Sequence, residues 1–139
     1  MYKRQPDTKL SVMEIKWGLV PDMGGMVLMR ELARSDVVRE LTYTGRVFSG
    51  EEALQLGFAT RLAADPLAEA LAMAHEIAGK SPDAIRAGKR LLNASLAHSA
   101  AELLIAESVE QQALIGSPNQ VEAVRANIER RAPRFTAPG

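Results

Sequence analysis

The chain has 139 residues, of which 47% are hydrophobic and 24% charged, so it can form one modest folded domain with a packed core. Its formal net charge is zero, which argues against a nucleic-acid partner or a polybasic membrane surface, because both need excess positive charge. It has no cysteine, so disulfides and cysteine-bound metals are excluded and a cytoplasmic location is predicted. Two widely spaced histidines do not predict a metal site, and no apolar run reaches the ~20 residues that cross a bilayer.

The first part of the chain places a carboxylate between an extended segment and a helix. Residues 8–13 are predicted to form a short strand or an extended segment, and Glu14 follows directly. Pro21 and the Gly24–Gly25 pair then break the chain before a helix predicted over 26–33. A carboxylate after a strand and near a helix N-terminus is suited to proton transfer. On the residues alone, the alternative is an ordinary solvated glutamate.

The rest of the chain is predicted to be a series of helices with recognisable ends. Serine followed three residues later by glutamate, as in Ser49–Glu52 and Ser99–Glu102, is the pattern of a capping box. Aspartate before proline, as in Asp65–Pro66, combines an N-cap with proline at the first helical position. Further helix starts and ends are predicted at Ser35, Gly45, Gly57, Gly79, Ser81–Pro82, Gly116 and Ser117–Pro118, with a short strand over 58–63. We therefore expect a short extended head followed by six or seven helices.

Apolar residues in the later helices recur at helical spacing, which predicts one buried face for each helix. In the last helix, Val121, Val124 and Ile128 are predicted to point inward. Trp17, the only tryptophan, is predicted to pack in the core. These patterns predict a mostly helical globular chain but no particular function.

Four motifs follow one another between about Leu10 and Phe135. They are Glu14-x-x-x-Gly18-x-x-Pro21-x-x-Gly24-Gly25; Thr44-Gly45-Arg46-Val47-Phe48-Ser49-Gly50-Glu51-Glu52-Ala53 closed by Gly57-Phe58; Ser81-Pro82 followed by Lys89; and Ile128-Glu129-Arg130-Arg131-x-Pro133-x-Phe135. In this order and spacing they resemble the crotonase superfamily, the enoyl-CoA hydratases and isomerases.

The resemblance implies a fold that is mostly α with a short β or extended N-terminal segment. This is the C-terminal part of a crotonase-like β/α spiral with its helical trimerisation region. The implied divisions are a non-matching leader over 1–7, the end of the spiral core over 8–64, and a helical C-terminal region over 65–139. The half of the family fold that carries the oxyanion-hole amides has no counterpart here. We therefore expect an N-terminally truncated copy that exposes apolar surface, associates with other chains and is inactive alone.

The resemblance also implies roles for three residues. Glu14 matches the catalytic glutamate, a general acid and base that moves a proton of an acyl-CoA thioester. Asp22 stands where hydratases commonly carry glycine; it is a candidate substrate-binding residue, although a helix cap before Gly24–Gly25 is the favoured interpretation. Arg130 matches a basic residue near the CoA phosphates, with a solvated surface arginine as the alternative. Acyl-CoA is the implied substrate, with no cofactor and no metal.

The implied function is acyl-CoA thioester chemistry, either the hydratase (lyase) reaction or Δ3,Δ2-enoyl-CoA isomerisation, in fatty acid metabolism. Asp22 weakens the assignment to hydration and leaves isomerisation open. The parent enzyme would be a homo-oligomer, a trimer or hexamer. The alternative, from another class, is a non-catalytic helical assembly or binding module derived from the family. The missing oxyanion-hole segment favours the module for this chain, whereas Glu14 favours the enzyme for its parent.

Overall fold

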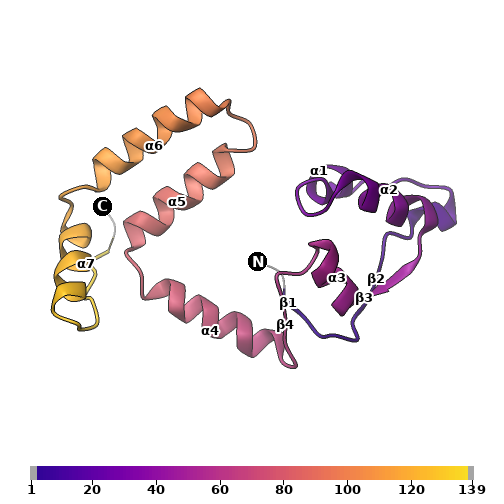
Figure 1. Ribbon diagram of the computed structural model, residues 1–139, viewed down its shortest axis with the longest axis horizontal. Helices are drawn as coiled ribbons and strands as arrows, with labels where there is room; N and C mark the ends of the chain where they lie inside the picture. The colour runs from indigo at the N-terminus through magenta and orange to yellow at the C-terminus, as the bar shows by residue number, and fades with distance from the viewer. Residues whose placement is uncertain (1–2, 138–139) are drawn as a thin grey trace. The chain divides into compact units, whose positions relative to one another are not determined.

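The structure, a computed structural model, describes residues 3–137. Residues 1–2 and 138–139, the ends of the predicted leader and of the predicted C-terminal region, lie outside the described residues. The chain divides into two compact units, Met1–Ala72 (unit 1) and Met73–Gly139 (unit 2). Helices form most of the described chain and the strands are short (Figure 1), which confirms the predicted fold class. The division falls inside a helix, eight residues after the predicted boundary at 64/65.

Unit 1 contains all the strands of the described chain. In chain order its elements are β1 (Lys3–Arg4), β2 (Lys9–Ser11), the 3-10 helix η1 (Glu14–Trp17), α1 (Gly25–Met29), α2 (Ser35–Thr44), β3 (Val47–Ser49), α3 (Gly50–Leu56) and β4 (Arg61–Leu62); α4 (Pro66–Ala78) spans the boundary. β1 pairs with β4 in parallel and β2 pairs with β3 antiparallel, so that Leu10 lies opposite Phe48. Each sheet therefore has two strands.

The core of unit 1 forms around the β2–β3 pair. Leu41 of α2 is fully buried, and Phe48, Ala53 and Ala59 are almost so. The rings of Phe48 and Phe58 pack with their centroids 5.7 Å apart and tilted by 51°, a favourable aromatic arrangement. This core anchors β2, from which the chain leads directly to Glu14.

The predicted capping box at the start of α3 is only half formed. The Ser49 hydroxyl accepts a hydrogen bond from the Glu52 N–H at 3.1 Å, as expected. The Glu52 carboxylate, however, binds Arg46 at 2.5 Å, and Arg46 also binds Glu40 at 2.6 Å. The Arg46 guanidinium holds the pKa of the Glu52 carboxyl below its usual range. A charged partner outside the motif thus displaces the local backbone contact.

Three other elements of unit 1 differ from their predicted bounds. α1 ends at Met29, and turns replace the predicted helix as far as residue 33. Ser35 is the first residue of α2, and no side chain caps this helix. The predicted strand over 58–63 is reduced to the two residues of β4. Such shifts are expected, because element ends are the least specified part of a sequence pattern.

Unit 2 is built from the end of α4 and from α5 (Pro82–Ala94), α6 (Ala100–Leu114) and α7 (Pro118–Ile128). α5 and α6 pack side by side (Figure 1), and Arg90 of α5 binds Glu110 of α6 at 2.7 Å. The capping box at Ser99 and Glu102 is complete, which confirms the prediction. Ser117 also caps α7 as predicted, accepting the Gln120 N–H at 3.4 Å.

A buried asparagine joins three parts of unit 2. Asn119 is only 3% exposed. Its Nδ2 donates to Asp83 Oδ2 at 2.7 Å and to the Thr136 carbonyl at 3.1 Å, and its Oδ1 accepts the Thr136 N–H at 2.9 Å. Asn119 therefore ties the start of α7 to the start of α5 and to the C-terminal segment. No sequence motif indicated this junction.

The inward face predicted for α7 is wrong. Val121, Val124 and Ile128 are 45%, 48% and 77% exposed, because α7 buries the small Ala126 and Asn119 instead. Trp17, predicted to lie in the core, is 76% exposed. Other exposed large apolar residues are Leu19, Val20, Met23, Leu92, Ile105 and Val109. The expected exposure of apolar surface is thus present in both units. No helix within residues 3–137 combines the length and the apolar character needed to cross a membrane.

Candidate active site

Strand β2 brings Glu14 to the end of helix α2. β2 ends at Ser11, three residues before Glu14. The Ser11 hydroxyl donates a hydrogen bond to the carbonyl of Gly45, directly after α2, at 2.9 Å. This bond and the β2–β3 ladder hold the segment that leads into η1.

Gly45 allows η1 to lie close to α2. It has a φ of 58° and ends α2, with its N–H donating to the Leu41 carbonyl at 3.0 Å. A Cβ at this position would come within 2.8 Å of Ile15 Cγ2. Glycine is therefore required both for the left-handed conformation and for the close approach of the residue after Glu14. The predicted helix end is confirmed.

The backbone of Glu14 is fixed by a single tight turn. The Glu14 carbonyl accepts the Leu19 N–H at 3.1 Å, and the Met13 carbonyl accepts the Lys16 N–H at 3.0 Å. Gly18 ends the turn with a φ of 68°. These contacts fix the backbone from which the Glu14 side chain extends.

The Glu14 carboxylate is left without a side-chain partner. The residue is half-buried and its Oε2 is inaccessible, yet this oxygen has no hydrogen-bond partner among the described residues. Leaving a buried polar atom unsatisfied costs roughly 1–3 kcal/mol, and more for a charged group. Such an atom in a native protein needs an explanation, and a catalytic role is one of the recognised ones. An unpaired carboxylate is chemically able to accept or release a proton.

Asp22 does not cap α1, so the favoured interpretation of this residue is wrong. The N-cap is Gly24, which has a φ of 79°, and no side chain caps the helix. Asp22 lies two residues before the N-cap, in an exposed turn, whereas a capping side chain normally belongs to the N-cap residue itself. Within the described residues no hydrogen bond or ion pair holds its carboxylate. Asp22 therefore remains a free carboxylate on the same segment as Glu14.

Gly25 allows close packing at the start of α1. A Cβ on Gly25 would lie 3.0 Å from Pro21 Cβ, tighter than ordinary van der Waals contact. The chain therefore turns tightly between Pro21 and the start of α1.

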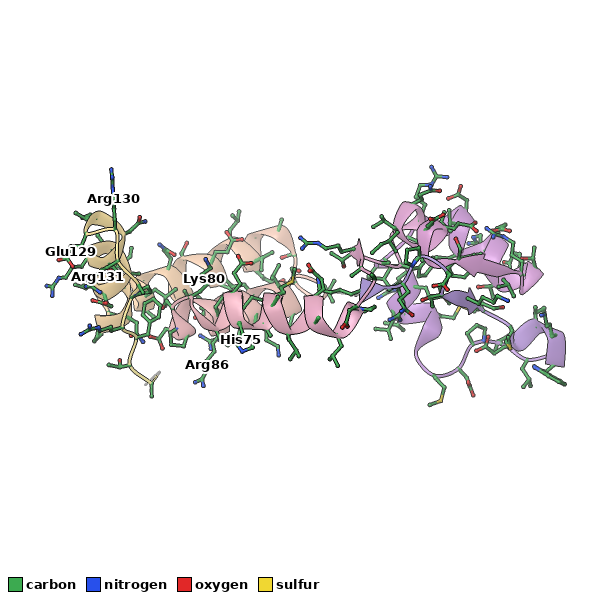
Figure 2. All side chains as sticks on the ribbon, turned by 90° about the horizontal axis from the view of Figure 1, so that it is seen from below. His75, Lys80, Arg86, Glu129, Arg130 and Arg131 are labelled. Carbon is green, nitrogen blue, oxygen red and sulfur yellow. The ribbon has the colours of Figure 1, made fainter. Side chains whose placement is uncertain are left out.

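Arg130 lies in unit 2, just after α7. Its φ is 52°, and its side chain points away from the ribbon into open space (Figure 2). The neighbouring Arg131 is engaged by Glu122 at 2.6 Å and by Glu129 at 2.5 Å. Arg130 has no such partner in the part of the chain that is described. The structure therefore places Glu14 and Asp22 in one unit and Arg130 in the other.

Sequence reasoning missed two residues that position Glu14. Ser11 and Gly45 are 34 residues apart in sequence and meet only through the fold. Gly45 was identified as a helix end, but its contact with Ile15 is not local. The Thr44-Gly45 pair at the predicted helix end was the signal in the sequence for Gly45.

Comparison with known proteins assigns the chain to a family. Residues 4–138 match the family model for enoyl-CoA hydratase/isomerase, so the chain belongs to the enoyl-CoA hydratase/isomerase family. This confirms the resemblance read from the four motifs. The match begins inside the segment 1–7 that was expected to lie outside the resemblance.

The relatives of the chain include proteins named as hydratases and proteins named as isomerases. The chain is 36% identical to "Probable enoyl-CoA hydratase echA8" of Mycobacterium leprae over 125 residues, which is 88% of this chain and 49% of that protein. It is 33% identical to human mitochondrial "Delta(3,5)-Delta(2,4)-dienoyl-CoA isomerase" over 127 residues, 88% of this chain and 39% of that protein. The chain spans about half or less of the length of these curated relatives.

Solved structures share the fold. A probable enoyl-CoA hydratase/isomerase from Mycobacterium abscessus superposes with a TM-score of 0.91 at 31% identity, covering 98% of this chain and 57% of that one. The enoyl-CoA hydratase from Mycobacterium tuberculosis gives a TM-score of 0.88 at 30% identity, with 96% and 54% covered. The chain therefore shares the fold of somewhat more than half of each of these solved chains.

Proposed function

We propose that this chain supplies the acid–base carboxylate of an enzyme that acts on acyl-CoA thioesters, and that Glu14 is that carboxylate. The observation that carries the proposal is the buried, unpartnered Oε2 of Glu14 on a segment that matches the family. In such chemistry a proton beside the thioester carbonyl leaves, and hydrogen-bond donors stabilise the enolate oxygen that forms. A carboxylate held near that carbon can accept the proton and return it.

Double-bond isomerisation is the second candidate beside hydration, and Asp22 favours it. Converting a 3,5-dienoyl to a 2,4-dienoyl thioester removes a proton from C2 and adds one at C6, as the name of the human relative implies. Two carboxylates at separate positions suit this transfer. Asp22 is not engaged as a helix cap and follows Glu14 by eight residues. We infer that Asp22 contacts the substrate in the isomerase case.

The role of Arg130 and the assembly of the protein extend the proposal. An unpaired arginine is suited to a phosphate group, because its guanidinium offers paired donors; we assign Arg130 to the CoA phosphates. Homo-oligomerisation is supported by the large exposed apolar side chains of both units. A cytoplasmic location stays a prediction, which rests on the absence of cysteine.

The non-catalytic module remains the alternative from another class. The exposed face of α7, with Val121, Val124 and Ile128, supports a binding role that would not need Glu14. The two functions differ in one respect, since only the enzyme requires the proton-transfer ability of Glu14.

The test restores a full-length fold. The N-terminal half of the Mycobacterium leprae relative is fused before residue 4, and the chimera is assayed with crotonyl-CoA and with a 3,5-dienoyl-CoA. Glu14→Gln should lower turnover at least ~10²-fold, because an amide cannot exchange a proton near neutral pH. Glu31→Gln, an exposed glutamate after α1, is the matched control and should retain activity. Normal turnover by Glu14→Gln would contradict the proposed role of Glu14. Asp22→Asn should lower turnover of the 3,5-dienoyl-CoA and leave turnover of crotonyl-CoA unchanged.

A further inference from the structure

A groove separate from the Glu14 carboxylate lies between α1 and α2, which neighbour each other in unit 1 (Figure 1). Its volume is about 300 Å³, and it is lined by Met26, Arg30, Ser35, Val38, Arg39, Thr42 and Tyr43. This volume is at the lower end of the range for small-molecule sites. The groove therefore suits a ligand of a few heavy atoms.

The groove carries two positive charges that no carboxylate neutralises. Arg39 donates to neutral groups, the Ser35 hydroxyl at 3.2 Å and the Tyr43 hydroxyl at 3.3 Å. Arg30 has no hydrogen-bond or ion-pair partner within residues 3–137. Among the described residues 3–137, none that lines the groove is acidic. The lining is thus complementary to an anion.

The nearest acidic side chains of α2 are engaged elsewhere. Asp36 binds Arg34 at 2.9 Å, and this bond holds the pKa of the Asp36 carboxyl below its usual range. Glu40 binds Arg46 at 2.6 Å. Each of these carboxylates forms an ion pair with another arginine, so neither of them neutralises the charge of Arg39.

The remaining lining is apolar, with one buried hydroxyl. Met26 and Val38 supply aliphatic surface. Thr42 is only 8% exposed, and its Oγ1 has no hydrogen-bond partner among the described residues. Buried polar atoms are normally satisfied. Charged walls, an apolar stretch and an unsatisfied hydroxyl together are features of a ligand site.

We propose that this groove binds a small organic anion, with a carboxylate or phosphate head on a short alkyl chain. Guanidinium groups pair with either head through two parallel hydrogen bonds, so Arg30 and Arg39 receive the head, and Met26 and Val38 contact the chain. The proposal goes beyond the proposed function, because it uses neither Glu14 nor the thioester reaction.

The test measures binding of simple probes to the chain by calorimetry. Hexanoate and hexyl phosphate distinguish the two heads, and 1-hexanol removes the charge. We expect at least one anion to bind with a Kd tighter than ~10 mM, and hexanol to bind at least about tenfold more weakly. Arg30→Gln and Arg39→Gln should each weaken anion binding about tenfold, the loss expected for a charged hydrogen bond.

The matched control is Arg61→Gln, which removes the same charge from unit 1 at a site paired with Glu69. It should leave affinity unchanged, and circular dichroism should show that all three variants keep their helices. Amide shifts in two-dimensional NMR should move around Thr42 and Arg39. Equal binding of hexanol and hexanoate, equal weakening by Arg61→Gln and Arg39→Gln, or no binding at 10 mM would each overturn the proposal.

Discussion

Replacing Gly45 with alanine should destabilise unit 1 by about 2–5 kcal/mol, the sum of two costs. The first is the left-handed φ of 58°, which costs an alanine roughly 1–2 kcal/mol. The second is the contact of the new Cβ with Ile15 Cγ2 at 2.8 Å, an overpacking that costs about 1–3 kcal/mol. Urea unfolding measures the sum as a change in the free energy of unfolding.

Gly18→Ala separates these two costs. Gly18 has a similar φ of 68°, but a Cβ there would meet nothing within 4 Å. It should therefore lose only the conformational part, roughly 1–2 kcal/mol. Adding Ile15→Ala to Gly45→Ala removes the clashing methyl and should recover the steric part. If Gly45→Ala costs no more than Gly18→Ala, and Ile15→Ala recovers nothing, the close packing of Ile15 against Gly45 does not contribute to the stability of unit 1.

Three further predictions concern the chain as it stands. The Arg131 guanidinium and the Arg134 N–H lower the pKa of Glu122 to about 2. Because this folded pKa lies below the unfolded value of 4.5, the ionised Glu122 carboxylate stabilises the fold above pH 4.5. This contribution to stability is lost as pH falls toward 2. Glu122→Gln should therefore flatten acid unfolding between these pH values, with Glu107→Gln as the control. Asn119→Ala should lower the free energy of unfolding, measured in urea, by about 1–3 kcal/mol, because Asp83 and Thr136 lose their buried partner. An unchanged urea midpoint would contradict the idea that Asn119 stabilises unit 2. The isolated chain should turn over crotonyl-CoA at no more than the background rate, since losing a single oxyanion donor already costs ~10²–10³ in rate; robust turnover would contradict the expected dependence on a second half.

Helix ends were predictable where their partners are local. Ser99 and Glu102 lie three residues apart, and their capping box is complete because nothing competes for either side chain. Ser49 and Glu52 have the same spacing, but Arg46 takes the Glu52 carboxylate and leaves half a box. Arg46 is itself placed by the turn at Gly45. A local motif therefore holds until a charged residue from a neighbouring element offers a stronger bond.

Buried faces were not predictable from periodicity. Val121, Val124 and Ile128 recur at helical spacing and still face out. Periodicity identifies one apolar side of a helix, but it does not show which neighbour will cover that side. In unit 2 the side chains that α7 buries are those of Ala126 and Asn119, and Asn119 bonds to Asp83 of α5. Family motifs did not help, because they describe chain order and not packing.

The candidate site shows the same division between local and distant information. The motif around Glu14 was readable because a carboxylate, a proline and two glycines lie in one short segment of the sequence. The burial of its Oε2 was not readable, since it depends on β2 pairing with β3 and on Gly45, 31 residues further along the chain. The unpaired arginines of the α1–α2 groove were equally hidden, because charge compensation on a helix is decided by which arginine reaches which carboxylate. In this chain, groups without partners are the ones that point to ligands, and a sequence lists residues without showing which of them are left unpaired.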